Sequence, residues 1–256
     1  MTATPTEPAP PADPIQAPGT PEQEWRDWNG LAALPEASLP GRGRAVVVAA
    51  HPDDEVLGAG GTIALLARAG LALTVVTVTD GEGSHPGSTR VTPDQLAATR
   101  AEELRRALDT LGAPDARVIR LKVADTRVAL HEEEVAAALE PLLAGARLCL
   151  APWTDDVHGD HEAAGRAAVM ASRAASVPCW TYPVWMWHWA RPGDPRVPWA
   201  AASAVRLPPA AAALKRRAVR HFVSQIAPLG PGRADAAVLP PEELAHHLRD
   251  IEVFFT

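Results

Sequence analysis

The sequence predicts an α/β fold, in which helices cover both faces of a mostly parallel sheet. Short apolar runs, typical of buried strands, alternate with longer amphipathic stretches that are typical of helices. Gly70, Gly112 and Gly145 follow three of these stretches, at the position where a glycine commonly ends a helix. Because each helix carries the chain back across the sheet, this alternation predicts a Rossmann-like, three-layer α/β/α arrangement.

The elements follow one another through most of the chain. We expect strands at 45–50, 72–79, 117–121, 147–151, 177–182 and 204–207. We expect helices at 55–69, 93–111, 131–144, 160–175, 209–225 and 241–253. The last of these begins with Pro-Glu-Glu, which suits a first helical turn because proline needs no backbone partner there and the helix dipole favours acids.

The composition divides the chain into three parts. Residues 1–22 are rich in proline, alanine and threonine and have little to bury, so we expect a disordered tail. Residues 23–43 contain tryptophans and leucines spaced by three, which predicts a short helix that docks on the domain, followed by a linker. Residues 44–256 are expected to form one domain of ordinary size.

Charge and cysteine content limit the class of protein. The formal net charge is −7 and there is no basic block, so nucleic acid and anionic membrane surfaces are poor partners. No apolar run reaches the length of a membrane span, and the N-terminus lacks the pattern of a signal peptide. Cys149 and Cys179 lie in strand-like runs, which predicts buried free thiols in a reducing cytoplasm.

Two polar clusters, AHPDDE and HGDH, each follow a predicted strand. Because parallel strands end at the same edge of a sheet, we expect His51, Asp54 and one of His158 and His161 to meet. Two imidazoles and a carboxylate, with one position left for water, are typical of catalytic zinc, and ferrous iron or another divalent metal uses the same ligand types. Aspartates also cap helices, so it is the second cluster that favours a metal site.

Together these motifs resemble the LmbE-like (PIG-L) family of zinc-dependent N-acetyl-sugar deacetylases, which includes the GlcNAc-phosphatidylinositol, mycothiol and bacillithiol pathway deacetylases. The resemblance rests on AHPDDE at 50–55 with the glycines after it, TDGE at 79–82, HGDH at 158–161, and a run from Lys215 to Gln225. It covers the chain from about residue 44 to the C-terminus. It therefore implies that residues 44–256 are a deacetylase catalytic domain.

The resemblance also implies the residues that perform the chemistry. His51, Asp54 and His161 correspond to the metal ligands of the family. Asp53 corresponds to the general base, which takes a proton from the attacking water and passes it to the leaving amine.

Further roles are implied around this centre. His158, in its protonated form, corresponds to the residue that stabilises the oxyanion, and Asp160 to the acid that hydrogen-bonds and orients His158. Arg100 and Asp125 correspond to positions that bind sugar hydroxyls. Some relatives carry a tyrosine where this chain has Asp156, so an oxyanion contact from that position is either absent or supplied by another group.

The function implied is removal of the N-acetyl group from an N-acetylglucosamine-type sugar or sugar conjugate, a small-molecule substrate, with release of acetate and a free amine. One alternative is an amidase that removes a longer N-acyl group from a glycoconjugate. Another is a sugar-binding relative without catalysis, which is disfavoured because no motif residue is missing.

Several features leave their alternatives open. Four of the eight tryptophans fall in the segment Trp180–Trp189, which suits either a wall of the substrate site or a contact in a homo-oligomer. His85 lies in a loop after a strand end, where it either reaches the substrate or is simply solvated. His221 and Gln225 share one face of a helix, either beside the site or in packing.

Overall fold

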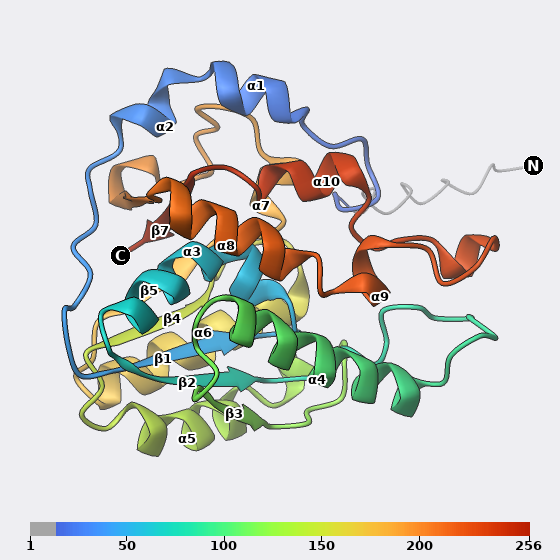
Figure 1. The fold of residues 1–256 in the computed structure, drawn as a ribbon, viewed down its shortest axis with the longest axis horizontal. Helices are drawn as coiled ribbons and strands as arrows, with labels where there is room; N and C mark the ends of the chain where they lie inside the picture. Colours follow the sequence, from blue (N-terminus) through green and yellow to red (C-terminus); the bar gives the residue numbers. More distant parts are fainter. Residues whose placement is uncertain (1–13) are drawn as a thin grey trace, which may run out of the picture.

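The computed structural model describes residues 14–256, and within this range the chain builds one seven-stranded sheet in the order β3-β2-β1-β4-β5-β7-β6 (Figure 1). The strands are β1 (Arg44–Ala49), β2 (Ala72–Thr77), β3 (Arg117–Arg120), β4 (Leu148–Pro152), β5 (Cys179–Tyr182), β6 (Ala202–Arg206) and β7 (Ile251–Phe255). Strands β1 to β5 are parallel to one another, and their order 3-2-1-4-5 is that of a Rossmann-type sheet. The predicted fold class is therefore confirmed.

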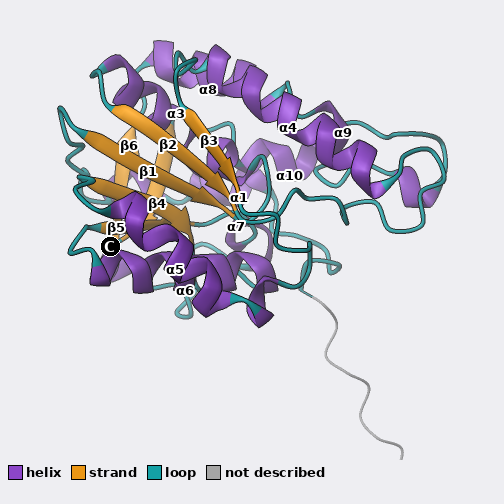
Figure 2. Cartoon of the chain, turned by 90° about the horizontal axis from the view of Figure 1, so that it is seen from below, coloured by secondary structure: helices purple, strands orange, loops and turns teal. Residues whose placement is uncertain are grey.

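Helices cover both faces of the sheet (Figure 2). One layer contains α3 (Asp54–Arg68), α4 (Pro93–Thr110) and α8 (Pro209–Val219), and the other contains α5 (Glu132–Leu143) and α6 (Gly159–Ala174). Successive residues of β1 point to opposite layers. Val47 packs with the first layer, whereas Val46 and Val48 pack with the second. Because both faces of β1 are covered, this strand reads as a continuous apolar run.

Shorter helices complete the described chain. They are α1 (Glu22–Asp27), α2 (Asn29–Ala33), α7 (Met186–Trp189), α9 (Val223–Ile226) and α10 (Pro241–His246), with 3₁₀ turns at Val128–Leu130, Trp199–Ala201 and Arg233–Asp235. The helix expected over 209–225 is thus divided into α8 and α9.

The C-terminal strand corrects the sequence prediction. We expected a helix over 241–253, but α10 ends at His246 and residues 251–255 form β7. This strand pairs antiparallel with both β5 and β6. Its sequence, Ile-Glu-Val-Phe-Phe, is rich in the β-branched and aromatic residues that favour strands. The acidic start of α10 is a genuine helix signal, but it extends for only six residues.

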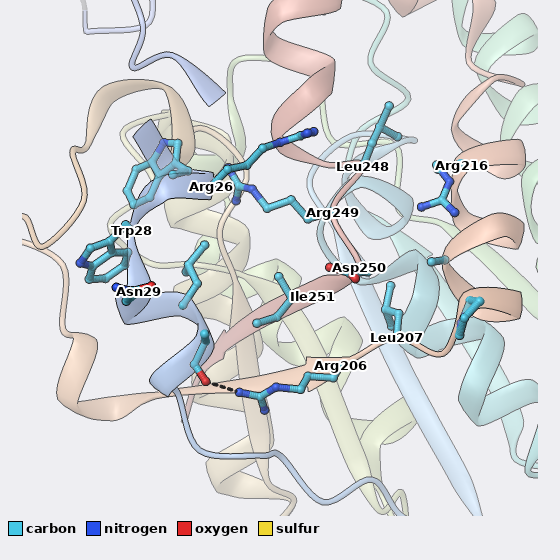
Figure 3. A pocket seen from close by; sticks show the side chains of 15 residues that line it. Arg26, Trp28, Asn29, Arg206, Leu207, Arg216, Leu248, Arg249, Asp250 and Ile251 are labelled. Atoms are coloured by element: carbon cyan, nitrogen blue, oxygen red, sulfur yellow. Dashed lines mark hydrogen bonds between the residues drawn. The ribbon is translucent and has the colours of Figure 1, made fainter. Parts of the chain in front are cut away.

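The N-terminal helices lie against one end of the domain (Figure 1). Two short helices replace the single one that was expected, because Trp28 between them has an extended backbone. The Trp25 indole is buried and donates a hydrogen bond to the Trp187 carbonyl over 2.9 Å. A cavity of about 750 Å³ separates these helices from β6, β7 and α8, and Arg206 donates to the Ala32 carbonyl across it (Figure 3).

Part of the expected disordered tail is packed on the domain. Residues 1–13 of that tail lie outside the described residues. Thr20, however, is buried, and its backbone N–H and hydroxyl donate to the carbonyls of His188 and Ala190 over 2.8 and 2.6 Å. The end of the expected tail, at Thr20, is therefore packed on the domain, because backbone carbonyls far away in the sequence supply partners that its own composition does not reveal.

Both cysteines are free thiols, with Cys149 buried and Cys179 partly buried. In the part of the chain that the structure covers, none of the helices has the length and apolar character needed to cross a membrane.

Candidate active site

The two polar clusters meet at the carboxyl edge of the sheet. AHPDDE lies between the end of β1 and the start of α3, and HGDH lies at the start of α6, just after β4. Since β1 and β4 are neighbouring parallel strands, both connections leave the sheet on the same side. This convergence is what the sequence predicted.

The three residues predicted to bind a metal have their ligand atoms in mutual contact. His51 Nδ1 is 3.2 Å from His161 Nε2 and 3.5 Å from Asp54 Oδ2. His161 Nε2 is also 3.3 Å from Asp54 Oδ1. His158 is a fourth neighbour, because one ring nitrogen from each of the three histidines falls within 4.8 Å of the others. The arrangement thus offers two imidazole nitrogens and a carboxylate to a single point.

Asp156 sets the orientation of His161, and sequence reasoning missed this role. His161 Nδ1 donates to Asp156 Oδ2 over 2.8 Å, which leaves the Nε2 lone pair directed at His51 and Asp54. The same carboxylate, which is completely buried, accepts the backbone N–H groups of residues 184, 185 and 186 over 2.9–3.0 Å. Asp156 lies five residues before His161 in the sequence, and this spacing was the available signal for the contact. From the sequence, position 156 was interpreted only as a place where some relatives carry a tyrosine.

Two carboxylates hold the other face of His51. Its Nε2 lies 3.2 Å from Asp125 Oδ1 and 3.4 Å from Asp160 Oδ2. Asp160 is fixed there because it accepts the backbone N–H groups of Thr126 and Val128 over 2.7 and 3.1 Å. Burial alone would lower the pKa of His51, but hydrogen bonds to three neighbouring carboxylates raise it well above its usual value.

These contacts correct the expectation for Asp160 and add a second contact to the one expected of Asp125. Asp160 was expected to orient His158, but it is bonded to the 126–128 turn and lies beside His51, whereas His158 Nδ1 is buried without a hydrogen-bond partner. Asp125, which was expected to bind sugar hydroxyls, lines the cavity, and that role stays a prediction; one of its oxygens faces His51 and the other accepts the Gly83 N–H over 2.9 Å. Both acids therefore position a predicted metal ligand.

His158 lines the cavity as a neutral imidazole. Burial, together with the neighbouring charges of His161 and His51, lowers the pKa of His158 to about 2. A neutral imidazole still donates one hydrogen bond. The lowered pKa favours the neutral ring, whereas the resemblance implied the protonated one.

Asp53 has an unusual backbone and an unusual acidity. Its φ of 147° lies in a region that residues other than glycine rarely adopt, and such strain is typical of functional sites. Burial raises the pKa of its carboxyl group, the Arg100 charge lowers it, and the Asp54 charge raises it, with a result of about 6. A carboxyl group with that pKa is able to both accept and release a proton near neutral pH.

Arg100 lies against Asp53 and also lines the cavity. Its Nη2 is 3.1 Å from Asp53 Oδ1 and donates to the Pro52 carbonyl over 2.9 Å, while Nη1 donates to the Gly81 carbonyl over 3.0 Å. Gly81 has a φ of 66°, and a Cβ there would lie 2.3 Å from Arg100 Nη1, so only glycine fits. Arg100 therefore contacts the candidate base, and its expected contact with sugar hydroxyls stays a prediction.

The site opens into a cavity of about 780 Å³. Its polar side includes Gly83, Ser84, Asp125 and Gln225, and its apolar side includes Ile15, Leu57, Val184, Trp185, Val238 and Leu239. Within the tryptophan-rich segment, Trp185 lines the cavity, whereas Trp187 packs on Trp25 and Trp189 stacks on Trp153. Of that segment, Trp185 and the neighbouring His188 therefore line the cavity, as a substrate wall would.

The contacts of His85 and His221 place both side chains outside the cavity lining. His85 is buried, lies 3.1 Å from the Ser84 hydroxyl, and does not line the cavity formed by the described residues. His221 pairs with the Thr110 hydroxyl over 2.7 Å, so it links the turn between α8 and α9 to the end of α4, while Gln225 of α9 lines the cavity.

The donor set suits a divalent cation. Five carboxyl groups are buried around the histidines, at positions 53, 54, 55, 156 and 160, and Asp125 is partly buried beside them, whereas Arg100 is a permanently charged cation in contact with Asp53. Buried carboxylates in such excess need compensation by protons or by a metal ion. The nitrogen and oxygen atoms that converge from His51, His161 and Asp54 are ligands that zinc accepts.

Comparisons with known proteins agree with this geometry. The family described as GlcNAc-PI de-N-acetylase, PIG-L, matches residues 46–172. A 1D-myo-inositol 2-acetamido-2-deoxy-alpha-D-glucopyranoside deacetylase from Kineococcus radiotolerans is 39% identical over 92 residues, 35% of this chain. That match spans 25% of the relative's length.

Two further relatives match over longer shares. An uncharacterized deacetylase of Escherichia coli, YaiS, is 31% identical over 135 residues, which are 50% of this chain and 67% of that protein. The crystal structure of a conserved protein from Thermus thermophilus, TT1542, is 30% identical, has a TM-score of 0.54, and aligns with 73% of this chain and 81% of its own. With both motifs and the fold in place, the chain belongs to the PIG-L family of deacetylases.

Proposed function

We propose that the protein hydrolyses the N-acetyl group of an N-acetylglucosamine-type sugar or sugar conjugate, releasing acetate and a free amine. One observation carries this proposal: His51 Nδ1, His161 Nε2 and Asp54 lie within 3.5 Å of one another at a cavity, with Asp53 beside them. The name of the Kineococcus relative, which specifies a 2-acetamido-2-deoxy-glucopyranoside, supports the substrate class.

His51, Asp54 and His161 would hold the metal ion, which we propose to be Zn²⁺, with Fe²⁺ or another divalent ion as alternatives of the same ligand type. A bound ion of this kind supplies Lewis acidity, which polarises an amide carbonyl and makes water a stronger acid. Asp125, Asp156 and Asp160 keep the two imidazoles in the required orientation.

Asp53 would act as general base and then as general acid. It accepts a proton from the attacking water, and it donates that proton to the nitrogen of the departing amine. Its neighbour Arg100 fixes the carboxylate through the 3.1 Å contact and keeps its pKa from rising further. Because an amine is a poor leaving group without a proton, this second transfer decides whether the carbon–nitrogen bond breaks.

His158 would stabilise the negative charge that develops on the carbonyl oxygen. Its ring lines the cavity, and burial lowers its pKa and so favours the neutral form, which still offers one N–H group as a donor. A donor placed in advance at a buried site is effective because it needs no reorganisation during the reaction.

We further propose that residues 44–256 form the catalytic unit and that the protein works in the cytoplasm, where free thiols such as Cys149 and Cys179 persist. A homo-oligomeric state stays a prediction from the tryptophan content of the sequence.

The test is acetate release from a panel of N-acetylglucosamine conjugates, measured with metal-stripped protein and again after Zn²⁺ or Fe²⁺ is restored. We expect release that depends on the metal, and the panel identifies the preferred conjugate. No acetate from any conjugate, but release of longer acids from N-acyl analogues, would favour the amidase alternative. Binding of the conjugates without any release would favour the non-catalytic sugar-binding alternative.

A further inference from the structure

A segment that precedes the family-matched region contributes to the active-site cavity. The family match begins at residue 46, yet Ile15 and Gln16 line the same cavity as His51 and Asp53. The side chain of Ile15 is partly buried there. Part of this cavity is therefore built by residues outside the region that carries the motifs.

His188 attaches this segment to the domain. The imidazole is buried, with Nε2 2.9 Å from the Ala17 carbonyl oxygen and Nδ1 2.6 Å from Glu243 Oε1. The His188 carbonyl accepts the Thr20 N–H over 2.8 Å. His188 of α7 therefore binds the segment through two hydrogen bonds, at Ala17 and at Thr20, and Glu243 of α10 holds the imidazole in place.

Gly19 is needed for this close approach. A Cβ at position 19 would lie 2.4 Å from His188 Nδ1 and 3.0 Å from Glu243 Oε1. Contacts of 2.4 Å do not occur between such atoms, so a larger residue would displace either the segment or the imidazole. The segment is thus fitted to His188, which itself lines the cavity.

The cavity is lined by apolar as well as polar side chains. Besides Ile15, the lining includes Trp185, Val238 and Leu239, which are apolar and supply no catalytic group. Apolar and aromatic walls with a few polar groups are typical of sites that bind drug-sized ligands, and about 780 Å³ is within the usual range. Aromatic faces such as that of Trp185 stack on flat or apolar groups.

We propose that residues 15–20 form a specificity wall, held by His188, which favours substrates that carry an apolar or aromatic group attached to the acetamido sugar. The inference rests on the proposed function, since it concerns the acceptor side of the same cavity. Ile15 supplies the apolar contact, and the contacts at Ala17, Gly19 and Thr20 fix its position.

Two glycosides test the wall, namely N-acetylglucosamine with an aryl aglycone and the same sugar with a methyl aglycone. For Ile15→Ala we expect kcat/KM on the aryl glycoside to fall roughly five- to twentyfold, since each buried methylene contributes about fourfold to binding and Ile15 is partly buried. The methyl glycoside should change by less than about twofold, because it does not reach the wall.

Gly19→Ala displaces the segment without touching a catalytic group, and we expect the same selective loss. Gly41→Ala is the matched control, because a Cβ at position 41 meets nothing within 4 Å. Thermal unfolding of each variant shows whether it is folded. Equal effects of Ile15→Ala on both glycosides, or no effect on either, would overturn the proposal.

Binding of the two glycosides, measured by calorimetry without turnover, separates this inference from the proposed function. If the wild type binds the aryl glycoside more tightly than Ile15→Ala does but releases no acetate, the wall stands and the deacetylase proposal fails. If acetate is released and Ile15→Ala binds and turns over both glycosides as the wild type does, the deacetylase proposal stands and the wall fails.

Discussion

Two buried clusters of charged residues are associated with the same helix, α3, and they differ in how completely their hydrogen bonds are satisfied. One lies at the start of the helix, around Asp53 and Asp54. The other lies at Gly61 and Thr62, where Glu252 of β7 approaches the helix. Both are almost inaccessible to solvent.

In the second cluster every carboxylate oxygen is used. Glu252 Oε1 accepts the Gly61 N–H over 2.7 Å and lies 2.8 Å from Lys215 Nζ. Glu252 Oε2 accepts the N–H and hydroxyl of Thr62 over 2.7 and 2.6 Å. Since α3 is kinked at Ala59, whose φ is −139°, residues 61 and 62 have free N–H groups like those at a helix start, and Glu252 caps them.

In the first cluster the polar atoms are not all satisfied within the protein. His158 Nδ1, Glu55 Oε1 and Arg100 Nε are buried without hydrogen-bond partners, and carboxylates outnumber cations. Strain at Asp53 belongs to the same region. A cluster that satisfies itself fixes the backbone, whereas a cluster with unmet partners is where a ligand and chemistry are expected.

The largest expected effect tests the chemical side of this comparison. Replacing Asp53 by asparagine removes the proton acceptor and keeps the shape, so kcat/KM for acetate release should fall by about 10²–10⁴-fold. Zinc content should stay at the wild-type level, because Asp53 is not among the proposed ligands. Steady-state kinetics and metal analysis check this, and activity within a few-fold of the wild type would remove Asp53 from the mechanism.

The structural cluster should respond in stability. Glu252→Gln removes the partner of the buried Lys215 ammonium, which should lower the free energy of unfolding by about 3–5 kcal/mol. Urea unfolding measures this change. The double variant Glu252→Gln with Lys215→Met removes the uncompensated charge and should recover part of the loss. If the double variant is as unstable as the single one, capping of Gly61 and Thr62 is the main contribution of Glu252.

Sequence patterns predicted the sheet and the place of the site for a physical reason. The strands at 45–50 and 147–151 are apolar on both faces, so they are central and parallel, and whatever follows them meets at one edge. The strand pattern therefore predicted that His51, Asp54 and one of His158 and His161 would meet, and the family resemblance selected His161.

Partners of individual side chains could not be predicted in the same way. Asp160 faces His51 because two N–H groups of the 126–128 turn fix its carboxylate, and the sequence around Asp160 contains no sign of that turn. Arg100 likewise reaches Asp53 from the middle of α4. Strand β7 was missed because its pairing partners lie far away in the sequence.

Asp156 combines features of both clusters, so its replacement sharpens the comparison. Its four hydrogen bonds are satisfied, yet one of them orients a proposed metal ligand. Asp156→Asn should weaken zinc binding by about 10–100-fold, the usual effect of losing an acid that orients a ligand histidine. Competition with a zinc chelator measures the affinity. Asp155→Asn, at an exposed neighbouring position, is the control and should bind zinc normally.

The smallest expected effect concerns Glu22, which belongs to a third ionic cluster. Its carboxylate pairs with His246 and Arg249, and none of the three is among the proposed catalytic residues. Burial raises the pKa of Glu22, but hydrogen bonds from His246 and Arg249 outweigh it and lower the pKa from 4.5 to about 2. A carboxyl group with a depressed pKa stabilises the folded state above its unfolded pKa, and loses that contribution as the pH falls towards its folded pKa.

Wild type and Glu22→Gln should therefore differ most in free energy of unfolding above pH 5, by about 1 kcal/mol for a partly exposed ion pair. The difference should shrink as the pH falls from about 4.5 to about 2. In this range Glu22 binds a proton in the unfolded chain but stays ionised in the folded protein. Glu24→Gln, at an exposed position with a 3.4 Å contact to Arg191, is the control and should show a smaller difference. A difference that grows on acidification would mean that Glu22 is bound more weakly in the folded protein than its contacts with His246 and Arg249 indicate.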